Sequence, residues 1–322
     1  MIEIYPLLLK PYYKDYLWGG SRLCREFGKE DAPTPTAESW ELVSREVEKS
    51  TIVNGSLAGK TLEDLRQLDA DQFWGTQCQK DRFPLLVKLI DAERDLSIQV
   101  HPSEDTAQMD VGEQGKAELW YVVDCLPHAY IYYGFSRMIG ENELIRRVDD
   151  GTICDVLNKV PVERGDVFYI LPGVIHAIGS GIVIAEIQQN SDTTFRIYDY
   201  LRQDMRGNMR PLHLQRAKSV IDYTPVIPTE CKVNSGAKFD GYSMAEMFSC
   251  RYFRAYRFDI TKGVRLNSDP RSFQHILFVE GHGVLRHQDL EMPFRKGNSF
   301  FIPAALGEYS VEGKCRMLLS HV

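Results

Sequence analysis

Residues 164–172 read Arg-Gly-Asp-Val-Phe-Tyr-Ile-Leu-Pro, and residues 296–303 repeat the pattern as Lys-Gly-Asn-Ser-Phe-Phe-Ile-Pro. Each copy has a basic residue, a glycine turn, a run of strand-forming residues with two adjacent aromatics, and a proline that ends the run. The repeat predicts two copies of one β-barrel unit. Only the first copy is followed by a histidine, His176, whereas the second continues Ala304-Ala305-Leu306-Gly307-Glu308. We therefore expect one barrel to perform chemistry and the other to lack the corresponding site.

The length of the chain and a change in composition predict two domains. The 322 residues correspond to about two domains of ordinary size. Residues 223–236 are rich in Pro, Ser, Gly and Asn, which is typical of an extended linker. Short strand runs separated by turns follow it. We predict a mainly β chain with a small α-helical portion: a domain at 1–224 with short helical insertions, a linker at 225–236 and a second barrel at 237–322.

Local signals place the first helices and strands. Thr61, followed by acidic residues and apolar residues at helical spacing, predicts the start of a helix, and Ser103 predicts another. Residues 141–157 read as one or two helices. The runs 118–123 and 129–133 read as two strands that pair with each other.

Charge and cysteine usage exclude several function classes. The formal net charge is −7 and the pI about 5.7, which argues against a nucleic-acid partner but leaves room for a local basic pocket. The seven cysteines are scattered without a CxxC pair, as expected of reduced thiols in a cytoplasmic protein. The start of the chain lacks the pattern of a signal peptide, and no apolar run approaches the ~20 residues of a membrane span. We expect a cytoplasmic protein with no membrane partner.

Four polar side chains interrupt runs that otherwise read as buried strand. Gln99 and His101 lie two apart in Leu-Ser-Ile-Gln-Val-His-Pro, so their side chains share a face; Glu118 lies in Lys-Ala-Glu-Leu-Trp-Tyr, and His176 in Gly-Val-Ile-His-Ala. Imidazole and carboxylate groups are ligands that suit Zn²⁺, whereas a carboxamide is a rarer one. A lone histidine at a strand end is more often structural, but a buried carboxylate needs a partner. The residues alone leave the metal site and the structural interpretation open.

Several blocks of the sequence together resemble one known family. They are Ala37–Glu41, Phe83–Lys88, Ser97–Pro102, Gly115–Tyr121, Gly173–Ala177 and Asn190–Asp199. These blocks are similar to those of type I mannose-6-phosphate isomerases of the short bacterial branch. The resemblance implies two cupin-type, jelly-roll β-barrels and one Zn²⁺ per chain, held by Gln99, His101, Glu118 and His176. It also implies interconversion of mannose 6-phosphate and fructose 6-phosphate by proton transfer through an enediol intermediate.

The same resemblance proposes residues for the substrate. Arg196 lies among apolar strand residues, where a charge is costly unless it faces a site, and it matches a family arginine of the active site. Lys116 and Ser97 match residues that contact substrate and phosphate, and Arg202 stands where longer relatives have a lysine. The alternatives are an arginine at the edge of a sheet, a solvated lysine and a serine at a strand end.

Glu186 matches a family glutamate proposed as the base. Its apolar neighbours predict burial, which raises the pKa of a carboxyl group. The alternative is that Glu186 neutralises Arg196 or Lys116, and His101 is a rival base.

Two other functions compete with the isomerase. One is a non-catalytic, metal-containing bicupin that binds or senses a sugar phosphate; the presence of Lys116 and Arg196 argues against it. The other is a metal-dependent dioxygenase, and the glutamine at position 99 argues against redox iron. We expect a small sugar phosphate as partner and a monomer or weak homodimer.

Overall fold

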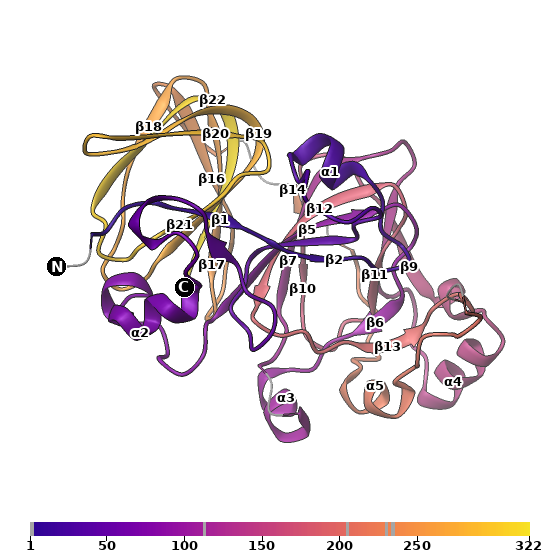
Figure 1. The fold of residues 1–322 in the computed structure, drawn as a ribbon. Helices are drawn as coiled ribbons and strands as arrows, with labels where there is room; N and C mark the ends of the chain where they lie inside the picture. The colour runs from indigo at the N-terminus through magenta and orange to yellow at the C-terminus, as the bar shows by residue number, and fades with distance from the viewer. Residues whose placement is uncertain (1–2, 112–113, 204–205, 229–230, 233–235) are drawn as a thin grey trace. The chain divides into compact units, whose positions relative to one another are not determined.

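Strand-forming residues dominate the chain, and the computed structural model is mainly β (Figure 1). It describes residues 3–111, 114–203, 206–228, 231–232 and 236–322. Contacts divide the chain into two compact units: unit 1 holds residues 1–14, 21–89 and 233–322, and unit 2 holds residues 15–20 and 90–232. This division differs from the continuous domain predicted at 1–224, because the strand Leu7–Lys10 pairs with the strand Ser299–Ile302. The linker predicted at 225–236 falls partly outside the described residues, at 229–230 and 233–235.

Unit 1 contains an antiparallel sheet in the order β15-β16-β17-β22-β19-β21-β1-β4. Leu7 and Leu8 of β1 lie opposite Phe301 and Phe300 of β21, which joins the two ends of the sequence in one sheet. The core includes Phe258, Ile276, Phe278, Phe300 and Met317. The elements are β1 Leu7–Lys10, β2 Tyr12–Lys14, α1 Arg22–Phe27, β3 Glu38–Leu42, β4 Thr51–Ile52, the 3₁₀ turn η1 Gly55–Leu57, α2 Leu62–Phe73, β15 Ala237–Phe239, β16 Tyr242–Ser249, β17 Arg254–Ile260, β18 Gly263–Asn267, β19 Gln274–His287, β20 Leu290–Arg295, β21 Ser299–Ile302 and β22 Glu308–His321. Strand β5, Leu85–Ala92, crosses the boundary between the units.

Unit 2 contains strands of two sheets, in the orders β14-β10-β7-β12 and β13-β6-β11-β8-β9. Its core cluster includes Ile98, Phe135, Ile175, Phe195 and Ile197. The elements are β6 Ile98–Val100, α3 Glu104–Val111, β7 Glu118–Cys125, β8 Tyr130–Phe135, α4 Glu141–Asp149, η2 Ile153–Val156, β9 Leu157–Pro161, β10 Asp166–Ile170, β11 His176–Ile178, β12 Ile182–Gln189, β13 Phe195–Tyr198, α5 Leu214–Val220 and β14 Cys231–Lys232.

The local predictions for helices are confirmed. Helix α2 begins after Thr61, whose hydroxyl accepts from the Asp64 N–H while the Asp64 carboxylate accepts from the Thr61 N–H. Helix α3 follows Ser103, and α4 with η2 occupies the region 141–157. No helix in the described part of the chain is long and apolar enough to cross a membrane.

The predicted pairing of 118–123 with 129–133 is wrong. Both runs form strands, but β7 pairs with β10 and β12, whereas β8 pairs with β11 and β9 in the other sheet. The turn at Leu126–Ala129, closed by a hydrogen bond from Ala129 N to Leu126 O, carries the chain from one sheet to the other. A short turn between two strands is therefore not sufficient to make them a hairpin.

A buried ion pair ties the N-terminal segment of unit 1 to its C-terminal strands. Lys29 Nζ lies 2.8 Å from the Glu41 carboxylate and donates to the carbonyl of Gly297 at 2.6 Å. Ser39 donates to the same carboxylate at 2.6 Å, and both charged side chains are buried. Burial raises the pKa of Glu41 and Lys29 opposes that rise. The ionised form of Glu41 thus depends on Lys29.

We predict that Lys29→Met lowers the free energy of unfolding by about 3 kcal/mol, because it leaves the Glu41 carboxylate buried without its counter-charge. Chemical denaturation would measure this loss. The matched variant Lys29→Met with Glu41→Gln should recover much of it, since the lone charge is removed. A loss below about 1 kcal/mol in the single variant would show that the pair contributes little.

Candidate metal centre and active site

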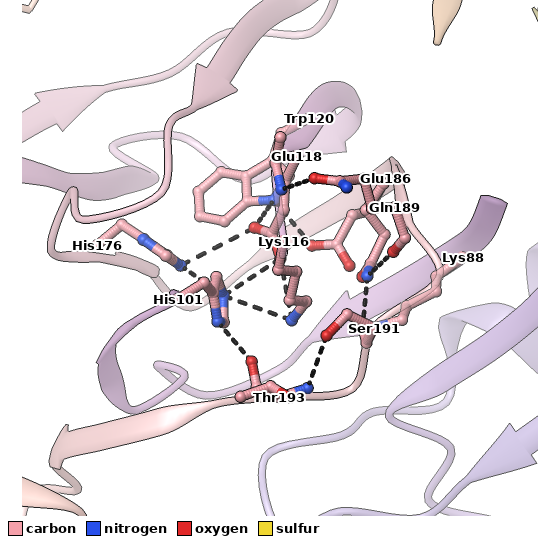
Figure 2. A network of polar contacts seen from close by, with 12 residues as sticks. Lys88, His101, Lys116, Glu118, Trp120, His176, Glu186, Gln189, Ser191 and Thr193 are labelled. Atoms are coloured by element: carbon pink, nitrogen blue, oxygen red, sulfur yellow. Dashed lines mark hydrogen bonds and ion pairs between the residues drawn. The ribbon is translucent and has the colours of Figure 1, made fainter. Parts of the chain in front are cut away.

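Three side chains of unit 2 meet in a buried cluster, which we call the triad: His101, Glu118 and His176 (Figure 2). The two Nε2 atoms of the histidines lie 3.2 Å apart, and His101 Nε2 lies 3.2 Å from Glu118 Oε1. The potential ligand atoms all lie within 4.8 Å of one another. The described residues form no other such group of His, Cys, Asp and Glu.

The second nitrogen of each imidazole fixes its tautomer. His101 Nδ1 lies 2.9 Å from the carbonyl of Thr193, and His176 Nδ1 lies 2.8 Å from the carbonyl of Val174. Because a carbonyl only accepts, both Nδ1 atoms carry the proton, and both neutral rings point an Nε2 lone pair into the cluster. Two lone pairs cannot bond each other at 3.2 Å. A cation between them resolves the conflict, so the donor set fits a divalent metal.

Strand register supports Gln99 as a fourth member. His176 at the start of β11 lies directly opposite Gln99 of β6, and Gln99 lies opposite Arg196 of β13. Directly opposed residues of antiparallel strands share a face, so the Gln99 and Arg196 side chains leave the sheet on the same side as His176. Glu118 starts β7 in the other sheet. The predicted origin of Glu118 and His176 on neighbouring strands is therefore wrong.

A tight turn before β11 aims His176. Gly173 has φ +87°, a conformation that favours glycine, and a Cβ there would lie 3.0 Å from the carbonyl of Val220. Its N–H donates to the carbonyl of His101 at 3.0 Å, and the Val174 N–H donates to Leu171 O at 3.1 Å. The turn thus joins the ends of β6 and β11 and brings the two histidines together.

Burial and neighbouring charges set the ionisation of the triad. Burial, with a smaller effect of His101, lowers the pKa of His176 to about 3. Burial and the Lys116 ammonium also lower the pKa of His101. Burial opposes ionisation of Glu118, but the Lys116 ammonium, together with the contact to His101, brings the pKa of that carboxyl well below its usual value. Two neutral imidazoles and one carboxylate are the forms that bind a metal.

Lys116 and Glu186, both predicted to be catalytic, lie beside the triad. Lys116 Nζ lies 3.0 Å from Glu118 Oε1 and 3.4 Å from His101 Nε2. Glu186, on β12, is buried, and its Oε2 accepts a hydrogen bond of 2.8 Å from the indole N–H of Trp120. The same N–H lies 3.1 Å from Glu118 Oε2. The single indole N–H of Trp120 thus contacts both the Glu118 carboxylate, a potential metal ligand, and the Glu186 carboxylate, the predicted base.

Arg202 and Arg210 form a cluster around Asp199, and Arg196 lies close enough to feel its charges. Arg202 and Arg210 both donate to the Asp199 carboxylate, Arg210 Nε at 2.8 Å, and Arg202 also donates to the carbonyl of Asp95. Burial and the nearby charge of Arg210 lower the pKa of Arg196. Arg196 Nη1 donates to Pro211 O at 2.9 Å, while its buried Nε has no hydrogen-bond partner in the described chain.

The remaining site residues divide into those predicted from sequence and those missed. Ser97, predicted to contact phosphate, is buried directly before β6. Trp120, Arg210 and the carbonyls of Thr193 and Val174 make contacts at these sites that were not predicted from the sequence. The Trp120 indole could have been suspected because it lies two residues from Glu118 on the same strand face.

A buried His–Glu–His cluster that joins two β-sheets is the site of a metalloenzyme-type β protein. Residues 7–124 match the family model of the phosphomannose isomerase type I catalytic domain, and residues 244–322 match that of the mannose-6-phosphate isomerase cupin domain. The chain belongs to the type I mannose-6-phosphate isomerase family and is an isomerase.

Individual relatives agree over nearly the whole length. The chain is 37% identical to mannose-6-phosphate isomerase ManA of Bacillus subtilis, over 98% of this chain and 99% of the relative. It is 32% identical to the mannose-6-phosphate isomerase of Streptococcus mutans, over 98% of both chains. The crystal structure of the mannose 6-phosphate isomerase from Bacillus subtilis superposes with a TM-score of 0.91 at 34% identity, covering 98% of this chain and 99% of that one.

We predict that His176→Ala abolishes stoichiometric metal binding, because it removes one of two converging lone pairs. Elemental analysis of the purified protein would measure the metal per chain. The matched control is His128→Asn at an exposed turn with φ +65°, where asparagine is tolerated, and it should keep its metal. Full occupancy in His176→Ala would remove His176 from the ligand set.

We also predict that Trp120→Phe weakens metal binding by about tenfold, because the Glu118 carboxylate loses the indole donor that orients it. The ring volume is largely kept, so the core should stay packed. Competition with a chromophoric chelator would give the dissociation constant. An unchanged constant would show that the indole N–H has only a packing role.

Proposed function

We propose that the protein is a zinc-dependent aldose-ketose isomerase that interconverts mannose 6-phosphate and fructose 6-phosphate by proton transfer through an enediol intermediate. The observation that carries the proposal is the convergence of two unprotonated Nε2 atoms and a buried carboxylate beside Lys116. The similarity to mannose-6-phosphate isomerases over 98% of the chain supports the choice of substrate.

One Zn²⁺ per chain would be held by His101, Glu118, His176 and the carboxamide oxygen of Gln99. Bound there, zinc would polarise the carbonyl and hydroxyl oxygens of the sugar. The Thr193 and Val174 carbonyls keep both imidazoles in the tautomer that leaves Nε2 free to bind. Burial of the triad excludes bulk water from the reacting atoms.

Glu186 and Lys116 are our proposed catalytic residues for moving the proton between C1 and C2. Trp120 orients the Glu186 carboxylate, and Lys116 Nζ supplies a positive charge 3.0 Å from Glu118. An ammonium at this position stabilises negative charge that develops on a sugar oxygen. Glu186 accepts the proton from one carbon and returns it to the other, while the hydroxyl proton moves between O2 and O1, so the two isomers keep the same atoms.

Arg196 is proposed as the main contact of the developing oxyanion or the phosphate, with Arg202 and Ser97 as further phosphate contacts. Arg196, Arg202 and Arg210 together exceed the single charge of Asp199, which leaves this cluster positive. The buried Arg196 Nε without a partner in the described chain is a donor that a substrate oxygen can satisfy.

We further propose that both halves of the chain derive from a cupin-type jelly-roll barrel, and that the enzyme works in the cytoplasm as a monomer or weak homodimer. The repeat of 164–172 at 296–303 supports the common architecture. The free thiols of Cys24, Cys78, Cys125, Cys154, Cys250 and Cys315 support a reducing compartment.

A coupled assay tests the reaction and the cofactor together. Purified protein should convert mannose 6-phosphate to fructose 6-phosphate, lose activity on chelation and regain it when Zn²⁺ is restored. Restoration by another divalent metal but not by zinc would overturn the choice of metal. No turnover by the fully metallated protein would overturn the isomerase and favour a protein that only binds sugar phosphate.

We predict that Arg196→Ala lowers kcat/KM by about two orders of magnitude or more, as loss of a partly buried charged contact to substrate should. Arg216→Ala, an exposed arginine of α5, is the matched control and should change it little. A decrease of less than about threefold in Arg196→Ala would remove Arg196 from the site.

A further inference from the structure

A polar cleft lies within unit 1, made only of residues of that unit. Its volume is about 570 Å³, within the range of small-ligand sites. The residues on which the argument rests are Arg251, Arg254, Asp269, Arg271, Gln274 and His321. None of them belongs to the unit that carries the triad.

Strand register shows that this cleft occupies the position that corresponds to the metal centre. In unit 2, Ile170 of β10 lies opposite Glu118 of β7. The repeated segment places Ile302 of β21 at the position of Ile170, and Ile302 lies opposite Gln274 of β19. Gln274 therefore stands where Glu118 stands in the other copy. The residue two further along is Trp120 in one copy and Ile276 in the other, and both are buried.

The side chains around Gln274 leave the sheet on its core face. Gln274 alternates with Ile276 and Phe278 of the core, and Arg254 alternates with Phe258 on β17. Arg254 lies directly opposite His321, which alternates with Leu319 and Met317 of the same core on β22. The end of the core is thus capped by polar groups in both copies, but in unit 1 a carboxamide and an arginine replace the acid.

Several contacts hold this polar end in place. The Gln274 carboxamide accepts from the Tyr309 hydroxyl at 2.5 Å and donates to Asn267 O at 3.1 Å. The His321 ring stacks on Tyr256 with centroids 5.9 Å apart and an interplanar angle of 7°. Arg271 is fixed by the carboxylate of Asp269. The side chains that line the cleft are therefore held in place by specific contacts at this end of the sheet.

The charge of the lining selects an anion. Arg271 is paired with Asp269, whereas Arg254 adds a positive charge that no carboxylate among the named lining residues offsets. Among the described residues, no carboxylate lies within ion-pair distance of Arg254. A metal ion would be repelled by this lining. A phosphate monoester carries about two negative charges at neutral pH and matches the arginine fork with its oxygens.

We propose that this cleft, the arginine cleft, is a second ligand site that binds a small phosphorylated compound, with Arg254 as its principal contact. The phosphoryl group sits between Arg254 and Arg271, and Gln274 and His321 line the space beside it. The C-terminal half of the chain thus keeps a ligand site where the other half has its metal centre. This proposal is independent of the identity of the isomerase substrate.

Calorimetric titration of the zinc-loaded full chain with inorganic phosphate tests the site. We expect two binding events per chain, one at each unit. Arg254→Gln should remove one event or weaken it by about tenfold or more, as loss of a charge-assisted contact does. Arg25→Gln, an exposed arginine of α1 outside the cleft, is the matched control and should keep both. Arg196→Ala should remove the other event.

The outcomes separate this proposal from the proposed isomerase. Phosphate binding that persists in Arg196→Ala and is lost in Arg254→Gln supports the arginine cleft, whatever the activity. An equilibrium mixture of the two hexose phosphates then distinguishes a sugar phosphate from free phosphate as the ligand. If the mixture competes with phosphate no better than phosphate itself, the cleft recognises only the phosphoryl group. Arg271→Gln provides a second variant if Arg254→Gln lowers the melting temperature. Binding unaffected by both cleft variants, or no binding to the Arg196→Ala protein by either probe, would overturn the proposal.

Discussion

The rest of unit 2 depends on one constraint: two imidazole lone pairs and a carboxylate meet inside the protein. His101 Nε2 and His176 Nε2 face each other at 3.2 Å, and no proton is available to join them because both Nδ1 protons go to carbonyls. Without a cation such an arrangement costs free energy twice, through desolvation and through repulsion of the lone pairs. The Gly173 turn and the pairing of β6 with β11 hold the two histidines together in spite of this cost.

The surroundings of the triad explain why its geometry is maintained. Glu118 Oε1 forms an ion pair with Lys116 and its Oε2 accepts from the Trp120 indole, so the carboxylate stays ionised although it is buried. Trp120 also contacts Glu186, so the orientations of the Glu118 and Glu186 carboxylates are coupled through one rigid ring. With the roles proposed above for these two residues, a change of metal occupancy would also affect the base.

Sequence patterns predicted those parts of the site that follow from local periodicity. The two-residue spacings of Gln99 with His101 and of Lys116 with Glu118 place side chains on one face, and the structure brings Lys116 to Glu118. They could not predict that Glu118 approaches from a different sheet, since β7 and β8 look like a hairpin locally. Nor could they show that Arg202 is bound by Asp199, because that contact depends on the turn in which the Arg202 N–H donates to Asp199 O. The pairing of β1 with β21 joins residues nearly the whole chain apart, which no local signal encodes.

The repeated strand segment shows how one backbone pattern can support two kinds of recognition. In both copies the aromatic-aromatic-isoleucine run covers a core, and the residue opposite the isoleucine, Glu118 or Gln274, stands at the polar end of that core. An acid at this position, with two histidines, makes the end attractive to a cation. A carboxamide with arginines nearby makes the electrostatic potential at this end of the core positive, while the strand register stays the same. Because the apolar layer beneath supplies the stability in both copies, the polar end is free to differ in charge, and its chemistry is set by a few side chains rather than by the fold.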